Sequence, residues 1–429
     1  MKTSPSLHDL APHTAVADAT YASSAVAATA AGANRTFNRA GVPRPARAVL
    51  RLLKNLSCGS LHLSLPDNGK LLFGSGQPHA HMRILDWRFF SSVLRKGDIG
   101  FAESWMDGYW TSPSVIEVID VAVANRQRLE QVVYGAWWGQ LYYRLKHLLN
   151  RNSRAGSRRN IHAHYDLGNA FYQLWLDPSM TYSSALFGDE PKLPLPLAQR
   201  AKYQRLIEQA QLTTGQSVLE IGCGWGGFAE QAATQGLNVT GLTISGEQLQ
   251  FAQQRLARQD LSHLAQLRLQ DYRQERGVYD AVVSIEMFEA VGEQYWPSYF
   301  QTVARSLRTG GRAAIQSIVI ADELFQRYRS NTDFIQQYVF PGGMLPTQTL
   351  FIEHARKAGL DCLQTHAFGL DYANTLAQWR RRCMAQSQQI LAQGFGTRFL
   401  RLWEFYLAYC ESAFRHHNTD VVQFTLVKT

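Results

Sequence analysis

The feature that most constrains this chain is a regular alternation of strand-like and helix-like stretches that begins near Leu197. The strand-like stretches are short and apolar: "SVLEI", "LNVTGLTIS", "LRLQDY", "YDAVVSI" and "GRAAIQSIVI". Strands that alternate with helices imply right-handed βαβ crossovers and a parallel sheet. Near the end, "DCLQTHAFG" and "DVVQFTLVK" add a final pair of strands. The sequence therefore predicts an α/β fold built on a mainly parallel sheet.

The first of these strands runs directly into a glycine-rich turn, "EIGCGWGG". Glycine tolerates positive φ and lets the backbone approach a ligand closely. A dinucleotide site is the obvious alternative, but such a site expects an acid near the end of the second strand. Here that strand ends in "GLTIS", so Thr243 stands where the acid is expected. A smaller nucleoside ligand without a pyrophosphate fits this pattern better.

The region before the alternation predicts a small α+β domain. "SLHLSLPDNGKLLFG" is typical of a hairpin that turns at "DNG". "DWRFFSSVLRKG" predicts a helix that ends at Gly97, and "SPSVIEVIDVAVAN" a second helix that Ser112 caps. With 429 residues, 45% of them hydrophobic, the chain can form two or three domains. We expect a disordered tail, the α+β domain, a basic connector and a catalytic domain over residues 1–38, 39–127, 128–165 and 166–429.

The connector is basic and aromatic, and the segment from Gln131 to Tyr165 contains no Asp or Glu. One interpretation is a helix packed between domains, followed by solvated arginines. The other is a helix on an anionic membrane surface, with aromatic residues at the interface. The net charge of +9 and the pI of about 9.3 favour an anionic partner. Nucleic acid is the weaker candidate, because no nucleic-acid-binding motif accompanies the charge.

The cysteines and the hydropathy indicate where such a chain works. The five cysteines are scattered and odd in number, so neither disulfides nor a metal site is indicated, and a reducing cytoplasm fits best. The sequence contains no run of about eighteen apolar residues, so no membrane-spanning helix is predicted. The first residues are a poor match to a signal peptide. We therefore expect a cytoplasmic protein at the inner face of the membrane.

Several motifs, taken together, resemble the cyclopropane fatty acid synthase family of S-adenosylmethionine-dependent methyltransferases. They are "HYDLGNAFYQLWLD", "MTYSSALF", "VLEIGCGWGG", "GLTISGEQ", "LQDYR", "FEAVG", "PGGMLPT" and "DYANTLAQW", which span residues 164 to 379. The resemblance implies a seven-stranded, Rossmann-like class I methyltransferase sheet. It places the sulfonium donor, S-adenosylmethionine, at the carboxyl ends of the strands. The residues that it implies for donor binding are Tyr182, Ser183, Gly222, Gly224, Gly226, Thr243, Gln248, Asp271 and Tyr272.

The resemblance also implies a reaction: a methyl group is added to a cis double bond of a phospholipid acyl chain, and a base then removes a proton. In the family, a bound bicarbonate ion is taken to be that base. The positions that hold it match Glu289, Tyr372 and the carbonyl of Ile318.

This sequence departs from the family at four positions around that ion. The family's cysteine is Ser184, two histidines are Gln316 and Ala290, and a glycine is Glu286. An anion site that loses polar partners and gains a like charge holds its anion less well. We therefore question bicarbonate and expect Glu286 to replace it as a base or cation stabiliser. The alternative is a Glu286 that faces solvent or pairs with an arginine.

The leading function is thus a lipid methyltransferase of the cyclopropane synthase type, with unsaturated acyl chains as substrates. A methyl- or methylene-branched product without ring closure is the alternative. Methylation of a small soluble amine is less favoured, because "FYQLWL" and "WEFYLAYC" suit a long apolar substrate. A lipid-binding protein without catalysis would fail to bind the donor. Neither nucleic acid nor metal is expected, and a homodimer is left open.

Overall fold

The computed structural model describes residues 41–129 and 167–429. The described residues form two compact units, one of residues 41–129 with 388–405 and one of residues 167–387 with 406–429. The predicted tail and nearly all of the predicted connector lie outside the described residues, so both stay predictions. None of the helices in the described parts is both long and apolar enough to cross a bilayer.

The first unit contains a four-stranded sheet with the order β2-β1-β3-β4. Its elements from residues 41–129 are α1 (Arg44–Leu53), β1 (Gly59–Ser64), β2 (Lys70–Ser75), β3 (His79–Ile84), α2 (Arg88–Lys96), α3 (Asp98–Met106), β4 (Trp110–Thr111) and α4 (Val115–Ala124). β1 and β2 form the predicted antiparallel hairpin, and Asn68 in its turn has a φ of 64°. The helix that Gly97 ends is also confirmed.

Two details of this unit differ from expectation. α4 is capped at Ser114, so the predicted cap at Ser112 is wrong: the Ser112 hydroxyl instead accepts a hydrogen bond of 3.0 Å from the Ser114 N–H. Residues 388–405, which the sequence analysis gave to the catalytic domain, group with this unit. The reason is packing against α3, where the Trp105 indole donates to the carbonyl of Arg401 at 3.0 Å.

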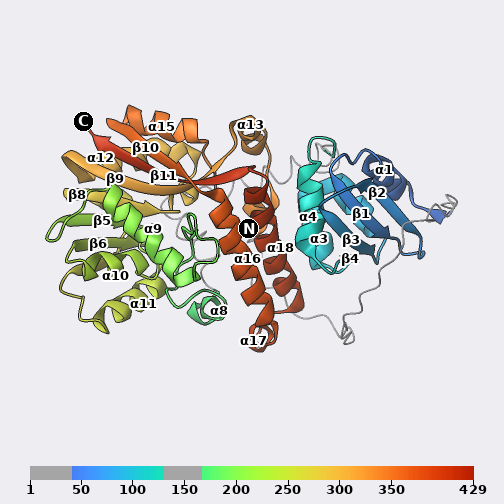
Figure 1. The fold of residues 1–429 in the computed structure, drawn as a ribbon, viewed down its shortest axis with the longest axis horizontal. Coiled ribbons are helices and arrows are strands. Elements are labelled where there is room, and N and C mark those ends of the chain that lie inside the picture. The colour runs from blue at the N-terminus through green and yellow to red at the C-terminus, as the bar shows by residue number, and fades with distance from the viewer. Residues whose placement is uncertain (1–40, 130–166) are drawn as a thin grey trace, which may run out of the picture. The chain divides into compact units, whose positions relative to one another are not determined.

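The second unit is built on a seven-stranded sheet with the order β10-β11-β9-β8-β5-β6-β7 (Figure 1). The strands are β5 (Ser217–Ile221), β6 (Asn238–Thr243), β7 (Ala265–Leu269), β8 (Tyr279–Ile285), β9 (Leu307–Ile320), β10 (Leu360–Ala367) and β11 (Thr419–Lys428). The main helices are α8 (Asn169–Gln173), α9 (Leu195–Gln209), α10 (Gly227–Thr234), α11 (Gly246–Ala257), α12 (Trp296–Ser306), α13 (Asp322–Ser330), α14 (Phe334–Tyr338), α15 (Gln348–Lys357) and α16 (Gly369–Ala385). Short 3₁₀ turns follow β7 and β8, at Tyr272–Gln274, Phe288–Ala290 and Glu293–Tyr295. Two further helices are α17 (Ser387–Ala392) and α18 (Thr397–Arg415), and α18 continues from one unit into the other.

The topology confirms the predicted fold class, a Rossmann-like class I methyltransferase sheet. β5 to β9 pair in parallel, and β11 inserts antiparallel between β9 and β10. The chain runs from β5 outward through β6 and β7, then crosses back to β8 and β9 on the other side of β5. In open α/β sheets, ligands bind beside the carboxyl ends of the strands at such a switch point. The pair β5 and β8 therefore marks where a site should lie.

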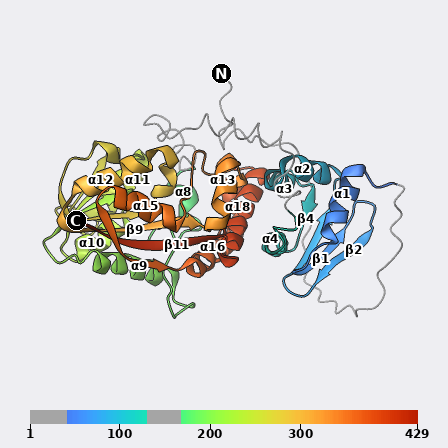
Figure 2. The same ribbon diagram turned by 90° about the horizontal axis from the view of Figure 1, so that it is seen from above.

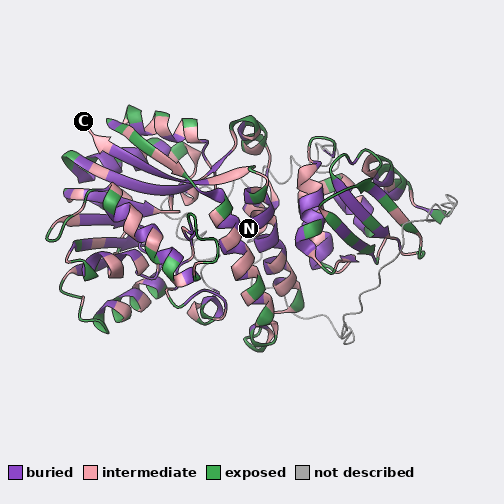
Figure 3. Ribbon diagram, in the orientation of Figure 1, coloured by how far each residue is buried: buried purple, intermediate pink, exposed green. Residues whose placement is uncertain are grey.

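Alternating side chains of the strands feed two cores, one on each face of the sheet. On one face α12 and α15 pack over Leu219 and Val282, and on the other α9, α10 and α11 pack over Val218 and Val283. Figure 2 shows α12 and α15 on one side of the sheet and α9 on the other, and the central strands are mostly buried (Figure 3). This rigid, two-sided packing holds the strand ends that carry the site in place.

Candidate functional site

A cavity of about 340 Å³ opens at the carboxyl ends of the central strands. Its lining includes Glu220 to Gly224 from the end of β5, Thr243 from the end of β6, Asp271 after β7 and Glu286 after β8. Residues far apart in the sequence thus meet at the switch point, as the topology requires. The volume lies within the range of small-molecule sites.

The glycine turn after β5 shows which glycine the ligand needs. Gly224 has a φ of 50°, lines the cavity, and a Cβ there would meet no other atom within 4 Å, so it would project into open space. At Gly222 a Cβ would lie 2.8 Å from Met287, and at Gly226 it would lie 2.9 Å from Ala252. Gly226 does not line the cavity, so helix packing, and not a ligand, accounts for that glycine.

The predicted donor-binding side chains around the turn form short polar pairs. Thr243 donates to the Gln248 side-chain oxygen at 3.1 Å. Asp271 holds the guanidinium of Arg273, with a shortest contact of 2.6 Å. The hydroxyls of Tyr182 and Tyr406 are 2.7 Å apart. These groups and Tyr272 all line the cavity.

Glu286 is the centre of the predicted catalytic group. Its Oε1 accepts hydrogen bonds of 2.8 Å from the Ser184 N–H and from the Gln316 amide, and its Oε2 accepts one of 2.7 Å from the Tyr372 hydroxyl. The expectation of a solvent-facing or arginine-paired Glu286 is therefore wrong. Its φ of 49° is left-handed, which costs a residue with a side chain about 1 kcal/mol. Three donors that converge on one carboxylate favour its ionised form.

Glu289 lies one turn further along and faces the same cavity. Its Oε1 accepts hydrogen bonds from the Ile318 N–H and, at 3.1 Å, from the Ser317 hydroxyl. The resemblance implied a role for the Ile318 carbonyl, whereas here the Ile318 N–H makes the contact. Oε2 of Glu289 has no hydrogen-bond partner among the described residues. Burial, together with the charge of Glu286, raises the pKa of Glu289 to about 8.

Two charged residues of this region were missed in the sequence. Glu220, the last acid of β5, is 3% exposed, lines the cavity and has one oxygen without a hydrogen-bond partner in the described parts of the chain. Burial raises its pKa to about 8. Lys202 of α9 is fully buried and donates a hydrogen bond of 2.5 Å to the Ser183 hydroxyl. Helical spacing could have revealed Lys202, because it falls on the apolar face that includes Leu195 and Leu206.

The charges of the cavity suit a cationic ligand. Glu220, Glu286 and Glu289 all line it, and two of them present oxygens without a hydrogen-bond partner among the described residues. A sulfonium ligand that carries an amino group would be attracted to these carboxylates. The open space over Gly224 lets the ligand lie close to the backbone of the glycine turn. The residues present therefore fit S-adenosylmethionine.

Much of the remaining cavity lining is apolar and aromatic. It includes side chains from α13 and α14, from the loop after them and from α16 and α18. They are Tyr328, Ile335, Phe340, Met344, Leu345, Leu376, Tyr409 and Phe414. A cavity lined by both carboxylates and apolar side chains can hold a cation beside a long apolar chain.

Most of the predicted site residues meet at this cavity. Those that line it are Glu286, Glu289, Ile318, Tyr372, Tyr182, Ser183, Gly222, Gly224, Thr243, Gln248, Asp271 and Tyr272. Ser184 and Gln316 lie behind the lining and reach it through Glu286. Gly226 is the third predicted residue that does not line the cavity, and it has no contact with Glu286 that would connect it to the site. Position is thus established for these residues, while their roles stay proposals.

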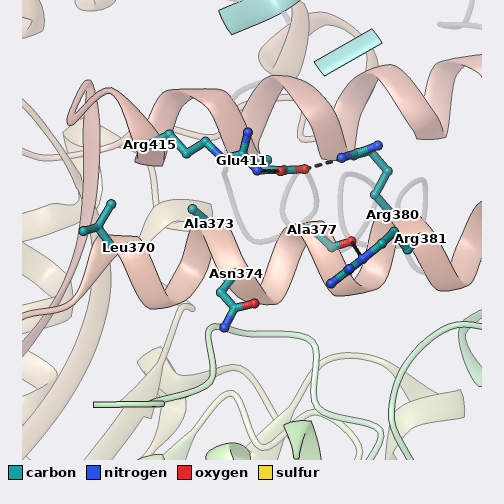
Figure 4. Close-up of a pocket in the computed structure, with 8 residues that line it drawn as sticks. All are labelled: Leu370, Ala373, Asn374, Ala377, Arg380, Arg381, Glu411 and Arg415. Atoms are coloured by element: carbon teal, nitrogen blue, oxygen red, sulfur yellow. Dashed lines mark hydrogen bonds and ion pairs between the residues drawn. The ribbon is translucent and has the colours of Figure 1, made fainter. Parts of the chain in front are cut away.

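A second cavity, of about 460 Å³, lies on other faces of α16 and α18 (Figure 4). Its central group is Glu411, whose side chain is fully buried and pairs with Arg380 at 2.9 Å and with Arg415. Arg381 points along the same groove and donates to the Ala377 carbonyl. This ion network joins the two helices that also carry Tyr372 and Tyr406 to the first cavity.

Comparisons with known proteins agree with this geometry. Residues 152–424 match the family model described as mycolic acid cyclopropane synthetase. The tuberculostearic acid methyltransferase of Mycobacterium tuberculosis is 38% identical, over 78% of this chain and 80% of the relative. The cyclopropane-fatty-acyl-phospholipid synthase of Escherichia coli is 34% identical, over 81% of this chain and 88% of the relative.

Solved structures show the same likeness in three dimensions. The cyclopropane synthase MmaA2 of Mycobacterium tuberculosis is similar with a TM-score of 0.59 and 30% identity, over 63% of this chain and 98% of that one. The mycolic acid cyclopropane synthase CmaA1, solved in complex with SAH and CTAB, has the same TM-score, 31% identity and the same coverage.

Proposed function

Because the chain belongs to the mycolic acid cyclopropane synthetase family and is an S-adenosylmethionine-dependent methyltransferase, we propose that it methylates a cis double bond in an unsaturated phospholipid acyl chain. The carboxylates of the cavity suit the cationic donor, and its apolar lining suits the acyl chain. The phospholipid is proposed from the Escherichia coli relative, whose name includes it.

The donor supplies an electrophilic methyl group, and the residues of the chain manage the charge that follows. The π electrons of the alkene form the new carbon–carbon bond, the carbon–sulfur bond breaks, and the neighbouring alkene carbon becomes cationic. Glu286, ionised and fixed in the cavity wall, stabilises this cation, and Glu289 adds to this where the cationic donor favours its ionised form below its raised pKa. Their geometry is set before the reaction by Ser184, Gln316 and Ile318, so little reorganisation is needed.

Glu286 then acts as the base. It removes a proton from the new methyl group, and the electrons of that C–H bond close the ring on the cationic carbon. Oε2 accepts one hydrogen bond, from Tyr372. A carboxylate oxygen has two lone pairs, so it can take the proton while Tyr372 stays bound.

One observation carries this assignment: the carboxylate of Glu286 is bound at the position that the resemblance gives to bicarbonate. Its contacts are Tyr372, which the resemblance assigned to the ion, and the replaced positions Ser184 and Gln316. A carboxylate has the shape and charge of bicarbonate. The chain therefore supplies its own anion, and bicarbonate is not required.

The test is a turnover assay with bicarbonate-depleted buffer and purified protein, on wild type, Glu286→Gln and Glu286→Gly. Wild type should keep its activity without bicarbonate. Both variants should lose about 10² to 10⁴ in kcat, as expected when a general base is removed. Wild-type activity that collapses without bicarbonate and returns on its addition contradicts the proposal, and would make Glu286 a bystander.

A methylene branch is the second candidate product, favoured by the 38% identical tuberculostearic acid methyltransferase. If a hydride shifts to the cationic carbon first, loss of the same methyl proton gives a terminal =CH₂ instead of a ring. Both products add one CH₂ to the lipid, and ozone cleaves the methylene product alone. Compared with the methylene product, a saturated methyl branch needs two further electrons and two protons, so a separate reductase would have to make it.

The membrane is the remaining part of the proposal. A phospholipid substrate requires access to a bilayer, and the acid-free segment from Gln131 to Tyr165, which lies outside the described residues, is the proposed contact. Binding to anionic vesicles should weaken with salt and on joint replacement of Arg151, Arg154, Arg158 and Arg159 by Ser. Equal binding to neutral vesicles would contradict an electrostatic contact.

A further inference from the structure

The buried lysine of α9 is the charged group near the site that the proposed reaction does not use. Lys202 is fully buried, does not line the cavity, and sits 4.6 Å from the centre of the Tyr203 ring. Its Nζ donates to the Ser183 hydroxyl at 2.5 Å. No carboxylate of the described residues lies within 4 Å of it in an ion pair. A buried ammonium without a contact ion pair is costly, so it calls for a role.

The surroundings of Lys202 connect it to the base through one short segment. Ser183 is bound from α9 twice, by Lys202 on its hydroxyl and by Gln199, which donates to its carbonyl at 3.0 Å. The next residue, Ser184, donates its N–H to Glu286. The segment is thus held between the ammonium on one side and the carboxylate on the other. The negative groups that act on Lys202 are, in order of effect, Glu286, Asp177 and Glu220.

We propose that Lys202 is a positioning residue for the base: its buried ammonium keeps the carboxylate of Glu286 ionised and holds the Ser183–Ser184 segment against it. The inference rests on the proposed role of Glu286. The proposed role of Lys202 also explains why a site for a cationic donor tolerates this lysine. The ammonium stands behind the wall and offsets the negative charge of Glu286 and Glu220, which line the cavity.

The electrostatics around Glu286 support this geometry. Burial raises the pKa of Glu286, while the charge of Lys202 and the hydrogen bonds from Tyr372, Ser184 and Gln316 lower it. Burial in turn lowers the pKa of Lys202 to about 7, while the charges of Glu286, Asp177 and Glu220 raise it. The charged forms of Lys202 and of Glu286 therefore stabilise each other. Glu289, from the 3₁₀ turn, and Glu220, from β5, are the other titratable acids that line this part of the cavity.

The test is the pH dependence of kcat/KM for Lys202→Met, Lys202→Arg and the control Arg200→Met. Loss of the ammonium should move the ascending limb to higher pH. On the ascending limb, well below its midpoint, kcat/KM should fall about tenfold for each pH unit of that displacement, and the curves should converge at high pH. Lys202→Arg should restore most of the wild-type profile. Arg200 is an exposed cation on the same helix, so its replacement should leave the profile unchanged.

A second measurement does not depend on how the Lys202 variants fold. The infrared difference spectrum between wild type and Glu286→Gln reports the carboxylate of Glu286 directly. An ionised carboxylate at about pH 7 is expected, and a protonated one overturns the inference. An unmoved pH profile in a folded Lys202→Met also overturns it. Full activity of Glu286→Gln would instead overturn the proposed base, so the two failures are distinguishable.

Discussion

The Tyr372 hydroxyl donates a hydrogen bond of 2.7 Å to Oε2 of Glu286, and so joins α16 to the end of β8. Tyr372 is buried, and its neighbour Phe414, 4.5 Å away between ring centres, fixes the phenol ring. The hydrogen bond stabilises the ionised carboxylate and aims one of its oxygens into the cavity. A tyrosine from the last third of the chain therefore controls the proposed base.

Replacement of Tyr372 by Phe should test that relationship. The variant keeps the ring but loses the donor to a charged group, which is worth about 1.5 to 3 kcal/mol, or about ten- to a hundredfold in kcat. Donor affinity, measured by calorimetry with S-adenosylhomocysteine, should stay near the wild-type value. A loss of donor affinity with unchanged kcat would place Tyr372 in the donor site instead.

The pH profile of wild type should show the base directly. Glu286 must be ionised to take a proton, so activity should be present above its pKa and fall as pH drops through it. Burial raises that pKa above the ordinary 4.5, so the ascending limb of kcat/KM should lie above 4.5. In Glu286→Gln the residual activity should lose this limb. A wild-type rate that is constant from about pH 8 down to about pH 4 would contradict an acid with a raised pKa.

Gly224→Val should abolish donor binding while the protein stays folded. The side chain would enter the open space above the turn, and valine disfavours a φ of 50°. Gly215→Val is the matched control, because Gly215 has a φ of 87° and equally open surroundings but is exposed and away from the cavity. Similar losses of donor affinity in both variants would mean that backbone strain, and not the cavity, is responsible.

Glu220→Gln should weaken donor binding. One oxygen of Glu220 is buried without a hydrogen-bond partner among the described residues, and it lines the cavity, so we expect it to receive the amino group of the donor. Loss of a charged acceptor should lower the affinity about ten- to a hundredfold. Calorimetry with S-adenosylmethionine measures this, and an unchanged dissociation constant would assign Glu220 to packing.

The sequence predicted most of the fold because its local patterns and its tertiary structure agree. The strand stretches and the glycine turn lie where the patterns place them, except that the third strand ends at Leu269 and the end of "LRLQDY" enters a turn. What it could not predict depends on contacts between distant segments. Gly226 was read as a ligand position although its packing against Ala252 explains it, whereas the Ser112 error is local, because Ser114 two residues on occupies the cap position.

The site shows the same division. Glu286 was singled out because it departs from the family pattern, but nothing local reveals that Ser184, Gln316 and Tyr372 converge on it. Lys202 went unnoticed because a lysine in a helix is normally a surface residue. Only the packing of α9 against the Ser183 segment makes it part of the site.

Glu411→Ala should destabilise the second unit more than any surface ion pair would. Glu411 is fully buried and pairs with Arg380 and Arg415, so its loss leaves two guanidiniums without their shared carboxylate. Breaking a buried pair costs about 3 kcal/mol, and we expect a lower urea midpoint. The control is Glu353→Ala, whose exposed pair with Lys357 is worth at most about 1 kcal/mol. Because α16 and α18 also carry Tyr372 and Tyr406, donor affinity should fall with stability in Glu411→Ala alone. Equal midpoints in the two variants would show that the network does not hold these helices together.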